Sequence, residues 1–112
     1  METKEFNNFK DALKSLAAKD REHVFVWHLL ESGEGIKPHY HPKTDEWLII
    51  NRGKFAIGVR DEEREFKLKR RVLAVRFPAN EKHSLLALSK ISYFVLRNRK
   101  DKTIYVEEGK QK

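Results

Sequence analysis

The chain has 112 residues, which is room for one domain with a single modest core. Its 39% hydrophobic residues exclude a disordered chain, and the lack of cysteine excludes a disulfide framework, a thiolate zinc cluster and a cysteine nucleophile. A formal net charge of +7 raises the question of an acidic partner. The sequence lacks the apolar run of a signal peptide or of a bilayer-spanning segment. We therefore expect a cytoplasmic protein that does not bind membranes.

The first segment is predicted to be an amphipathic helix over about residues 4–19. Large apolar side chains recur there at three- and four-residue spacing, at Phe6, Phe9, Leu13 and Leu16. We expect residues 1–21 to form a helix or arm that packs on the outside of the domain or on a partner subunit.

From residue 22 onward the pattern changes to short strands. The first, Glu22–Glu31, is so continuously apolar that we expect it to be covered on both faces. Others follow at near-regular spacing: Pro38–His41, Glu46–Asn51, Lys54–Arg60, Arg64–Lys69, Arg71–Phe77, His83–Ser89, Ile91–Asn98 and Thr103–Glu107. This pattern predicts an all-β sandwich or barrel over residues 22–108, with a frayed tail at 109–112.

Two details of these strands can be predicted further. Asn51-Arg52-Gly53 is a tight-turn signal, so we expect the strands on either side of it to pair as a hairpin. His23 and His28 lie on opposite faces of the first strand. We interpret both as surface or hydrogen-bonded histidines, because neither has a partner histidine at a chelating spacing.

The stretch from Gly33 to Glu46 carries the most specific chemical pattern. Side chains of a strand alternate between faces, so His39 and His41 point the same way and Tyr40 points the other. Pro38 and Pro42 flank them and favour extended backbone. The helical zinc-protease arrangement is therefore excluded. With Glu46 and the distant His83, three of the five histidines and one carboxylate stand at spacings that suit a metal.

These residues give the chain a resemblance to the cupins. The first cupin motif, G-x5-H-x-H-x(3–4)-E-x6-G, is matched at every defined position, by Gly33, His39, His41, Glu46 and Gly53. In the second motif, G-x5-P-x-G-x2-H-x3-N, Pro78 and His83 are in register. Val72, Asn80 and Ala87 replace the other three defined residues. Asn80 is the mildest change, because asparagine tolerates the left-handed backbone that glycine would supply.

The resemblance covers about residues 22–107 and implies a cupin jelly-roll barrel. It implies that His39, His41, Glu46 and His83 face inward onto one divalent metal. Three neutral imidazoles and a carboxylate suit Fe, Mn, Ni, Cu or Zn and do not choose between them. An octahedral ion would keep two positions open for a substrate, whereas tetrahedral zinc would close the shell and make the site structural.

Alternation with the ligands predicts a largely apolar pocket wall, formed by Leu48, Ile50 and Leu85. Four polar side chains either line the pocket or lie outside it, with the outside favoured: Arg60, Arg76, Tyr40 and Tyr93. Trp27 and Trp47 are expected in the core or in a subunit interface. The basic runs at 67–71 and 97–102 lack a nucleic-acid motif, so we interpret them as solvated strand edges.

The resemblance and the pocket together indicate a metal-dependent enzyme that acts on a small organic molecule. Dioxygenase chemistry is the first hypothesis, and sugar isomerase or epimerase chemistry stands behind it. The alternative is a non-catalytic module that only binds a small ligand. The reaction class rests on analogy with the family, since cupins have many activities. A homodimer is expected, because the N-terminal helix and the outward-facing Trp47 and Ile49 need cover.

Overall fold

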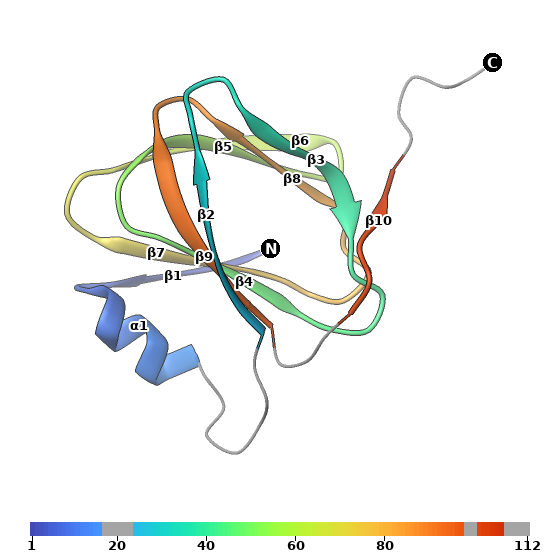
Figure 1. The fold of residues 1–112 in the computed structure, drawn as a ribbon, viewed down its shortest axis with the longest axis horizontal. Coiled ribbons are helices and arrows are strands. Elements are labelled where there is room, and N and C mark those ends of the chain that lie inside the picture. The colour runs from blue at the N-terminus through green and yellow to red at the C-terminus, as the bar shows by residue number, and fades with distance from the viewer. Residues whose placement is uncertain (17–23, 98–100, 107–112) are drawn as a thin grey trace.

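The computed structural model describes residues 1–16, 24–97 and 101–106, which form two antiparallel sheets and one short helix (Figure 1). The elements are β1 (Glu2–Phe6), α1 (Phe9–Leu16), β2 (Val24–Leu30), β3 (Gly35–Tyr40), β4 (Glu46–Ile50), β5 (Gly53–Val59), β6 (Glu62–Leu68), β7 (Val72–Phe77), β8 (His83–Ala87), β9 (Ile91–Arg97) and β10 (Ile104–Tyr105). The predicted all-β fold is confirmed. No helix in the described ranges is long and apolar enough to cross a membrane.

The two sheets pack face to face as a jelly roll. The first sheet has the strand order β1-β7-β4-β9-β2, and the second has the order β10-β3-β8-β5-β6. Most neighbours are far apart in sequence, so the chain passes repeatedly from one sheet to the other. Inward-facing apolar side chains of both sheets form the core: Leu30, Leu48, Ile50, Phe55, Ile57, Leu73, Val75, Phe77, Leu85, Ala87, Ile91, Tyr93 and Val95.

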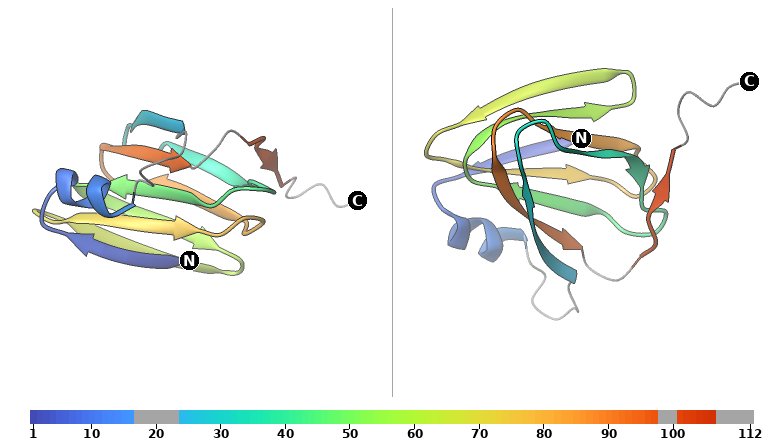
Figure 2. Two further views of the ribbon diagram at one scale, coloured as in Figure 1. Left: turned by 90° about the horizontal axis from the view of Figure 1, so that it is seen from below. Right: turned by 45° about the horizontal axis from the view of Figure 1, so that its top comes forward.

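A second, smaller cluster covers the outer face of the first sheet. Helix α1 lies against this face (Figure 2) and buries Ala12 against Ile49 and Val72. Phe9 and Phe94 pack beside them with a ring-centroid distance of 4.6 Å. Ile49 was expected to need a subunit to cover it, and the chain's own helix does so instead.

The helix predicted over residues 4–19 begins only at Phe9, so the start of that prediction is wrong. Glu2–Phe6 forms β1, which pairs with β7 from Glu2 opposite Arg76 to Phe6 opposite Val72. The side chain of Asn8 then accepts a hydrogen bond from the Asp11 amide at 2.8 Å and caps the helix start. Pairing with the edge of β7 therefore outweighs the helical spacing of the apolar residues in this segment. Residues 17–19, the end of the predicted helix, lie outside the described ranges.

The turn predicted around Gly53 is present, but the strands beside it form no hairpin. β4 pairs with β7 and β9 in the first sheet, whereas β5 pairs with β8 and β6 in the second. Gly53 has a φ of +110°, and a Cβ atom there would lie 2.6 Å from Cγ2 of Ile91. Glycine therefore lets the chain cross between the sheets through a space that no side chain could share. The turn signal correctly predicts a change of chain direction, but it does not indicate which sheet the next strand joins.

Strand β2 was expected to be covered on both faces, and it is not. It is the edge strand of the first sheet and pairs only with β9 among the described residues. Trp27 is 54% exposed and Phe25 is 44% exposed. Trp27 is thus not a core residue, whereas Trp47 is half-buried with the Lys4 ammonium 5.6 Å from its ring centroid. A continuous apolar run is shared by buried strands and by strands that bind another surface, so the sequence pattern did not separate the two.

Candidate metal centre

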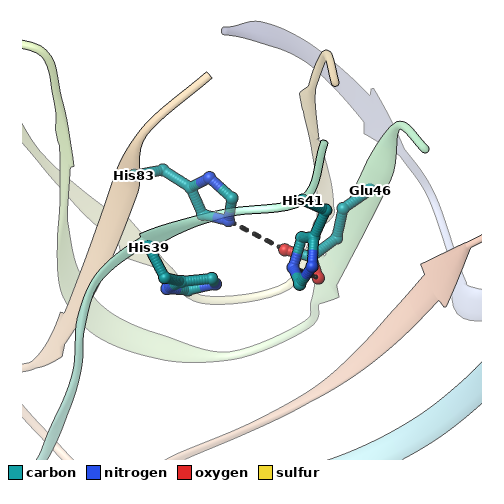
Figure 3. A group of neighbouring side chains, drawn as sticks. All are labelled: His39, His41, Glu46 and His83. Carbon is teal, nitrogen blue, oxygen red and sulfur yellow. Dashed lines mark hydrogen bonds and ion pairs between the residues drawn. The ribbon is translucent and has the colours of Figure 1, made fainter. Parts of the chain in front are cut away.

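The four residues that the sequence singled out come together at one end of the barrel (Figure 3). His39 lies on β3 directly opposite His83 on β8, in the second sheet. His41 follows the end of β3, and Glu46 begins β4 in the first sheet. All four are buried, with exposed fractions of 4% to 7%. The site therefore bridges the two sheets from the inside.

An irregularity in β3 aims His39 into the barrel. The pairing of β3 with β8 shifts register between Ile36 and His39, around Pro38, which has no amide hydrogen to donate. Ile36 packs against the core, so strict alternation from it would turn His39 outward. The extra residue reverses the alternation. His39 and His41 then share the inner side of the strand, as their spacing predicts.

One potential ligand atom from each of the four residues lies within 4.8 Å of all the others. Metal–ligand bonds of nitrogen and oxygen are about 2.0–2.2 Å long, so two ligands on opposite sides of an ion are about 4.2 Å apart. The group is therefore close to the size that a single ion needs.

Backbone carbonyls fix the tautomer of all three imidazoles. Each Nδ1 lies within hydrogen-bond distance of a carbonyl oxygen: His39 with Lys37 at 2.8 Å, His41 with Lys102 at 3.1 Å and His83 with Glu81 at 2.9 Å. A carbonyl only accepts, so Nδ1 must carry the hydrogen. A neutral ring then presents a bare Nε2 lone pair, which is the form that binds a metal.

The bare nitrogens face an ionised carboxylate. Oε1 of Glu46 lies 2.9 Å from Nε2 of His83, and Oε2 lies 3.0 Å from Nε2 of His41 (Figure 3). Nε2 of His41 is buried and lacks a hydrogen-bond partner of good geometry within the described part of the chain. Lone pairs this close repel one another unless a proton or a cation lies between them. The donor set therefore fits a divalent metal.

The pKa values show the same competition for a positive charge. Burial lowers the pKa of His39. Burial also acts to lower the pKa of His41, but the adjacent Glu46 carboxylate outweighs it and the net shift is upward. Burial acts to raise the pKa of Glu46, and its contacts with His41 and His83 overcome this and hold the pKa well below its usual range. Glu46 is thus ionised at neutral pH and attracts a cation.

A cavity of about 180 Å³ opens beside the four ligands. Of the predicted wall residues, Leu48 and Leu85 line it, while Ile50 lies deeper in the core. Tyr93, for which a position outside the pocket is favoured by the sequence, lines the cavity as well. Burial, followed by the charge of Glu46, raises the pKa of Tyr93 to about 12, so its hydroxyl keeps its proton.

The remaining polar candidates do not line this cavity. Arg76 is held outside by ion pairs, with Nη1 2.9 Å from Oδ2 of Asp45 and Nε 3.0 Å from Oε1 of Glu2. Arg60 lies in the turn after β5 with a φ of +59°. Tyr40 is half-buried on β3.

Four polar cavity residues were missed by the sequence analysis: His28, Arg97, Thr103 and Tyr105. Nε of Arg97 lies 3.5 Å from Oε2 of Glu46, its cross-strand partner on β4. The sequence pattern predicts that Arg97 belongs to a solvated basic run, yet its side chain is only 16% exposed. Its alternation with the inward-facing Tyr93 and Val95 was the signal that could have placed it. His28 stacks on Tyr93 with a ring-centroid distance of 5.2 Å.

The departures from the second motif are accommodated locally. Asn80 has a φ of +72°, the left-handed conformation expected for a residue that replaces glycine. Its amide donates a hydrogen bond of 2.8 Å to the carbonyl of His41. Val72 and Ala87 are buried apolar residues at a strand start and a strand end. The loop after β7 therefore helps to position His41.

Comparisons with models of protein families and with curated proteins find no match to this chain. Solved structures do match. A cupin-2 domain containing protein from Shewanella frigidimarina is 20% identical, with a TM-score of 0.58 over 82% of this chain and 93% of that chain. KdgF from Halomonas sp. is 20% identical, with a TM-score of 0.60 over 74% of this chain and 76% of that one.

A variant of salicylate 1,2-dioxygenase from Pseudoaminobacter salicylatoxidans is 17% identical, with a TM-score of 0.57. The match covers 68% of this chain and 21% of that chain, so this chain spans about a fifth of the dioxygenase. At these identities the comparisons address the fold alone. Together with the two five-stranded sheets and their strand order, they show that the chain has the cupin fold.

Proposed function

We propose that this chain is a metal-dependent enzyme that acts on a small organic molecule, with dioxygenase chemistry as the first reaction to test. One observation carries the proposal. Three buried imidazoles have their Nδ1 atoms tied to backbone carbonyls, so three Nε2 lone pairs converge on one ionised carboxylate beside a cavity. This set of nitrogen and oxygen donors suits Fe, Mn, Ni, Cu or Zn.

In this proposal His39, His41, Glu46 and His83 hold the ion at the inner end of the cavity. A bound divalent ion polarises a coordinated oxygen atom and, if it is redox-active, supplies electrons for oxygen chemistry. The chain itself supplies shape and orientation. Leu48 and Leu85 exclude water from one wall, and the protonated Tyr93 hydroxyl offers a hydrogen-bond donor.

The size of the cavity supports a small substrate. Its volume of about 180 Å³ is below the roughly 300–1,000 Å³ of pockets for drug-sized ligands. A compact molecule with an apolar part against Leu48 and Leu85 fits these limits.

The choice of dioxygenase chemistry is supported by fold analogy. Salicylate 1,2-dioxygenase has a similar fold in part of its chain, and one fold can host many reactions. The second candidate is a non-catalytic module that binds a small ligand in the same cavity, and a sugar isomerase or epimerase is the third. In this proposal the partner is a small molecule rather than a nucleic acid. The protein is proposed to be a homodimer, because β2 exposes large apolar side chains.

Metal analysis of the purified protein tests the site. We expect about one transition metal per chain, lost in His41→Ala and kept in His28→Ala, which removes a cavity histidine outside the ligand set. Equal, low metal contents in all three proteins would refute the metal site.

Oxygen uptake then tests the reaction. Protein loaded with Fe, Mn, Ni, Cu or Zn is assayed with thiols, diketones, flavonols and phenolic acids. Uptake that matches product formation supports a dioxygenase. Sugar conversion without oxygen uptake supports the isomerase, and tight ligand binding without turnover by any metal form supports the binding module.

A further inference from the structure

The edge strand β2 presents an unusual apolar surface. Phe25, Trp27 and Leu29 lie on its outer face and are 44%, 54% and 43% exposed. Phe25 stacks on Phe94 of the neighbouring strand with a ring-centroid distance of 4.8 Å, so the exposed row continues the aromatic cluster beside the helix. Figure 1 shows β2 beside β9, which is its one paired strand among the described residues. A row of large apolar groups along an open strand edge is a place for another strand to bind.

Two other edge strands carry charges that protect them against such pairing. β1, the opposite edge of the first sheet, has the sequence ETKEF, and β6, an edge of the second sheet, has the sequence EEREFKL. Charged side chains on an edge strand discourage pairing with another chain. β2 has the sequence VFVWHLL, without a single Lys, Arg, Asp or Glu. The chain carries a net charge of +7, yet this edge is left uncharged.

We propose that β2 is the interface of a homodimer, in which the β2 strands of two copies pair antiparallel about a two-fold axis at Trp27. This pairing uses all seven residues and merges the two first sheets into one of ten strands. It sets Trp27 opposite its own copy and Phe25 opposite Leu29, so apolar side chains meet along the whole outer face. A register shifted by one residue would place outer-face residues opposite inner-face ones.

A second copy of the chain fits this edge better than a different partner. The strand has no charge that calls for an opposite charge on another protein. On its outer face the apolar residues are arranged symmetrically about Trp27, so this face of the strand complements itself. Two copies would also satisfy each other's backbone amides and carbonyls on the side of β2 that pairs with no strand in the described ranges.

In the proposed dimer, the second copy would also contribute to the cavity beside the metal ligands. On the inner face of β2, His28 lines the cavity, and Val26 is 38% exposed. The two-fold pairing sets Val26 of the second copy opposite His28. The second copy thus adds an apolar side chain at the cavity rim. This link to the cavity rests on the proposed function, whereas the interface itself does not.

Sedimentation of the purified full chain tests the interface. We expect a mass of twice the 13.3 kDa of the chain for the wild type and a shift to monomer for Trp27→Lys. Leu86→Lys is the matched control, because Leu86 is 38% exposed on the second sheet and should leave the dimer intact. A monomeric wild type, or a Trp27→Lys variant that stays dimeric, would overturn the proposal. Full metal content in Trp27→Lys would separate loss of the dimer from failure of the metal site.

Single cysteines test the register, since the native chain has none. Opposite Cα atoms in an antiparallel pair are about 4.5–5.5 Å apart, within the range of a disulfide. Trp27→Cys should therefore form a covalent dimer under mild oxidation. Leu29→Cys should not, because the two Leu29 positions are offset by four residues, or about 13 Å. Cross-linking at Leu29 would overturn the proposed axis, and this result is informative even if Trp27→Cys folds poorly.

Discussion

The two ends of the barrel interior are built on the same strands but by different means. Along β4 the inward side chains run from Glu46 through Leu48 to Ile50, and along β8 they run from His83 through Leu85 to Ala87. Each strand begins with a potential ligand, continues with a cavity wall and ends in the packed core. Ile50 and Ala87 are both fully buried. One end is left open for a ligand, whereas the other is filled by side chains.

The difference shows what each end depends on. The metal end depends on the orientation of its side chains and on their charge, since backbone carbonyls orient the imidazoles around a carboxylate. The packed end is set by volume, with Phe55 and Ile57 fully buried between the sheets. Substitutions at the metal end should therefore change metal affinity more than stability, and those at the packed end the reverse.

The largest effect is expected from Glu46→Gln at the metal end. This change keeps the shape of the side chain and removes the negative charge that faces two imidazoles. We expect metal affinity to fall by more than about 100-fold, because replacing even a group behind a ligand often costs 10- to 100-fold. Titration of the metal-free protein with Co²⁺ or Zn²⁺, followed spectroscopically or by calorimetry, measures it. An unchanged affinity would remove Glu46 from the ligand set.

Phe55→Ala should do the opposite. Phe55 is fully buried beside Phe66, with ring centroids 5.3 Å apart, so the variant leaves a large cavity. We expect the free energy of unfolding to fall by about 3–5 kcal/mol. The folded variant should bind metal like the wild type. Denaturant unfolding and the same metal titration test both halves of this statement. If Phe55→Ala does not fold, Ile57→Val offers a milder loss of about 0.5–1.5 kcal/mol.

The sequence was sufficient for most of the metal end. Strand alternation, two prolines and the motif spacing placed His39, His41 and Glu46, because each property is local. The position of His83 came from a motif register. The carbonyls that orient the rings could not be foreseen, since Lys102 lies 61 residues from His41 and any residue offers a carbonyl. The metal itself remains a proposal.

The errors elsewhere have a common cause, which is that pairing partners are chosen across the whole fold. β1 is mostly polar, and only the free edge of β7 makes it a strand. β5 follows a clear turn but pairs in the other sheet. The apolar sequence of β2 predicts cover on both faces, whereas its large side chains are exposed in the folded chain.

Acid should weaken the metal end of the metal-free protein. The pKa of Glu46 is lower in the folded chain than in the unfolded chain, so below the ordinary value near 4.5 the unfolded state binds more protons. The stability from Glu46 is therefore present above about pH 4.5 and is lost as pH falls below it. Urea unfolding between pH 5 and pH 3 should show a steeper loss for the wild type than for Glu46→Gln. Parallel slopes would mean that Glu46 has no stabilising contacts in solution.

A smaller effect is expected from Asp101→Ala, which tests whether a residue outside the ligand set tunes the site. The Asp101 carboxylate accepts hydrogen bonds from the amides of Lys43, Thr44 and Lys102, at 2.6, 3.0 and 2.8 Å. Burial acts to raise the pKa of Asp101, but these bonds together outweigh it and lower the pKa, and they fix the segment whose Lys102 carbonyl orients His41.

We expect Asp101→Ala to weaken metal binding by about tenfold, because the imidazole loses its fixed orientation while every ligand remains. Asp61→Ala is the control, since Asp61 is an exposed carboxylate in the turn after β5. It should bind metal like the wild type. An equal loss of metal affinity in both variants would indicate a general effect of negative charge. No loss in Asp101→Ala would show that the packing around His41 is sufficient to orient its imidazole ring.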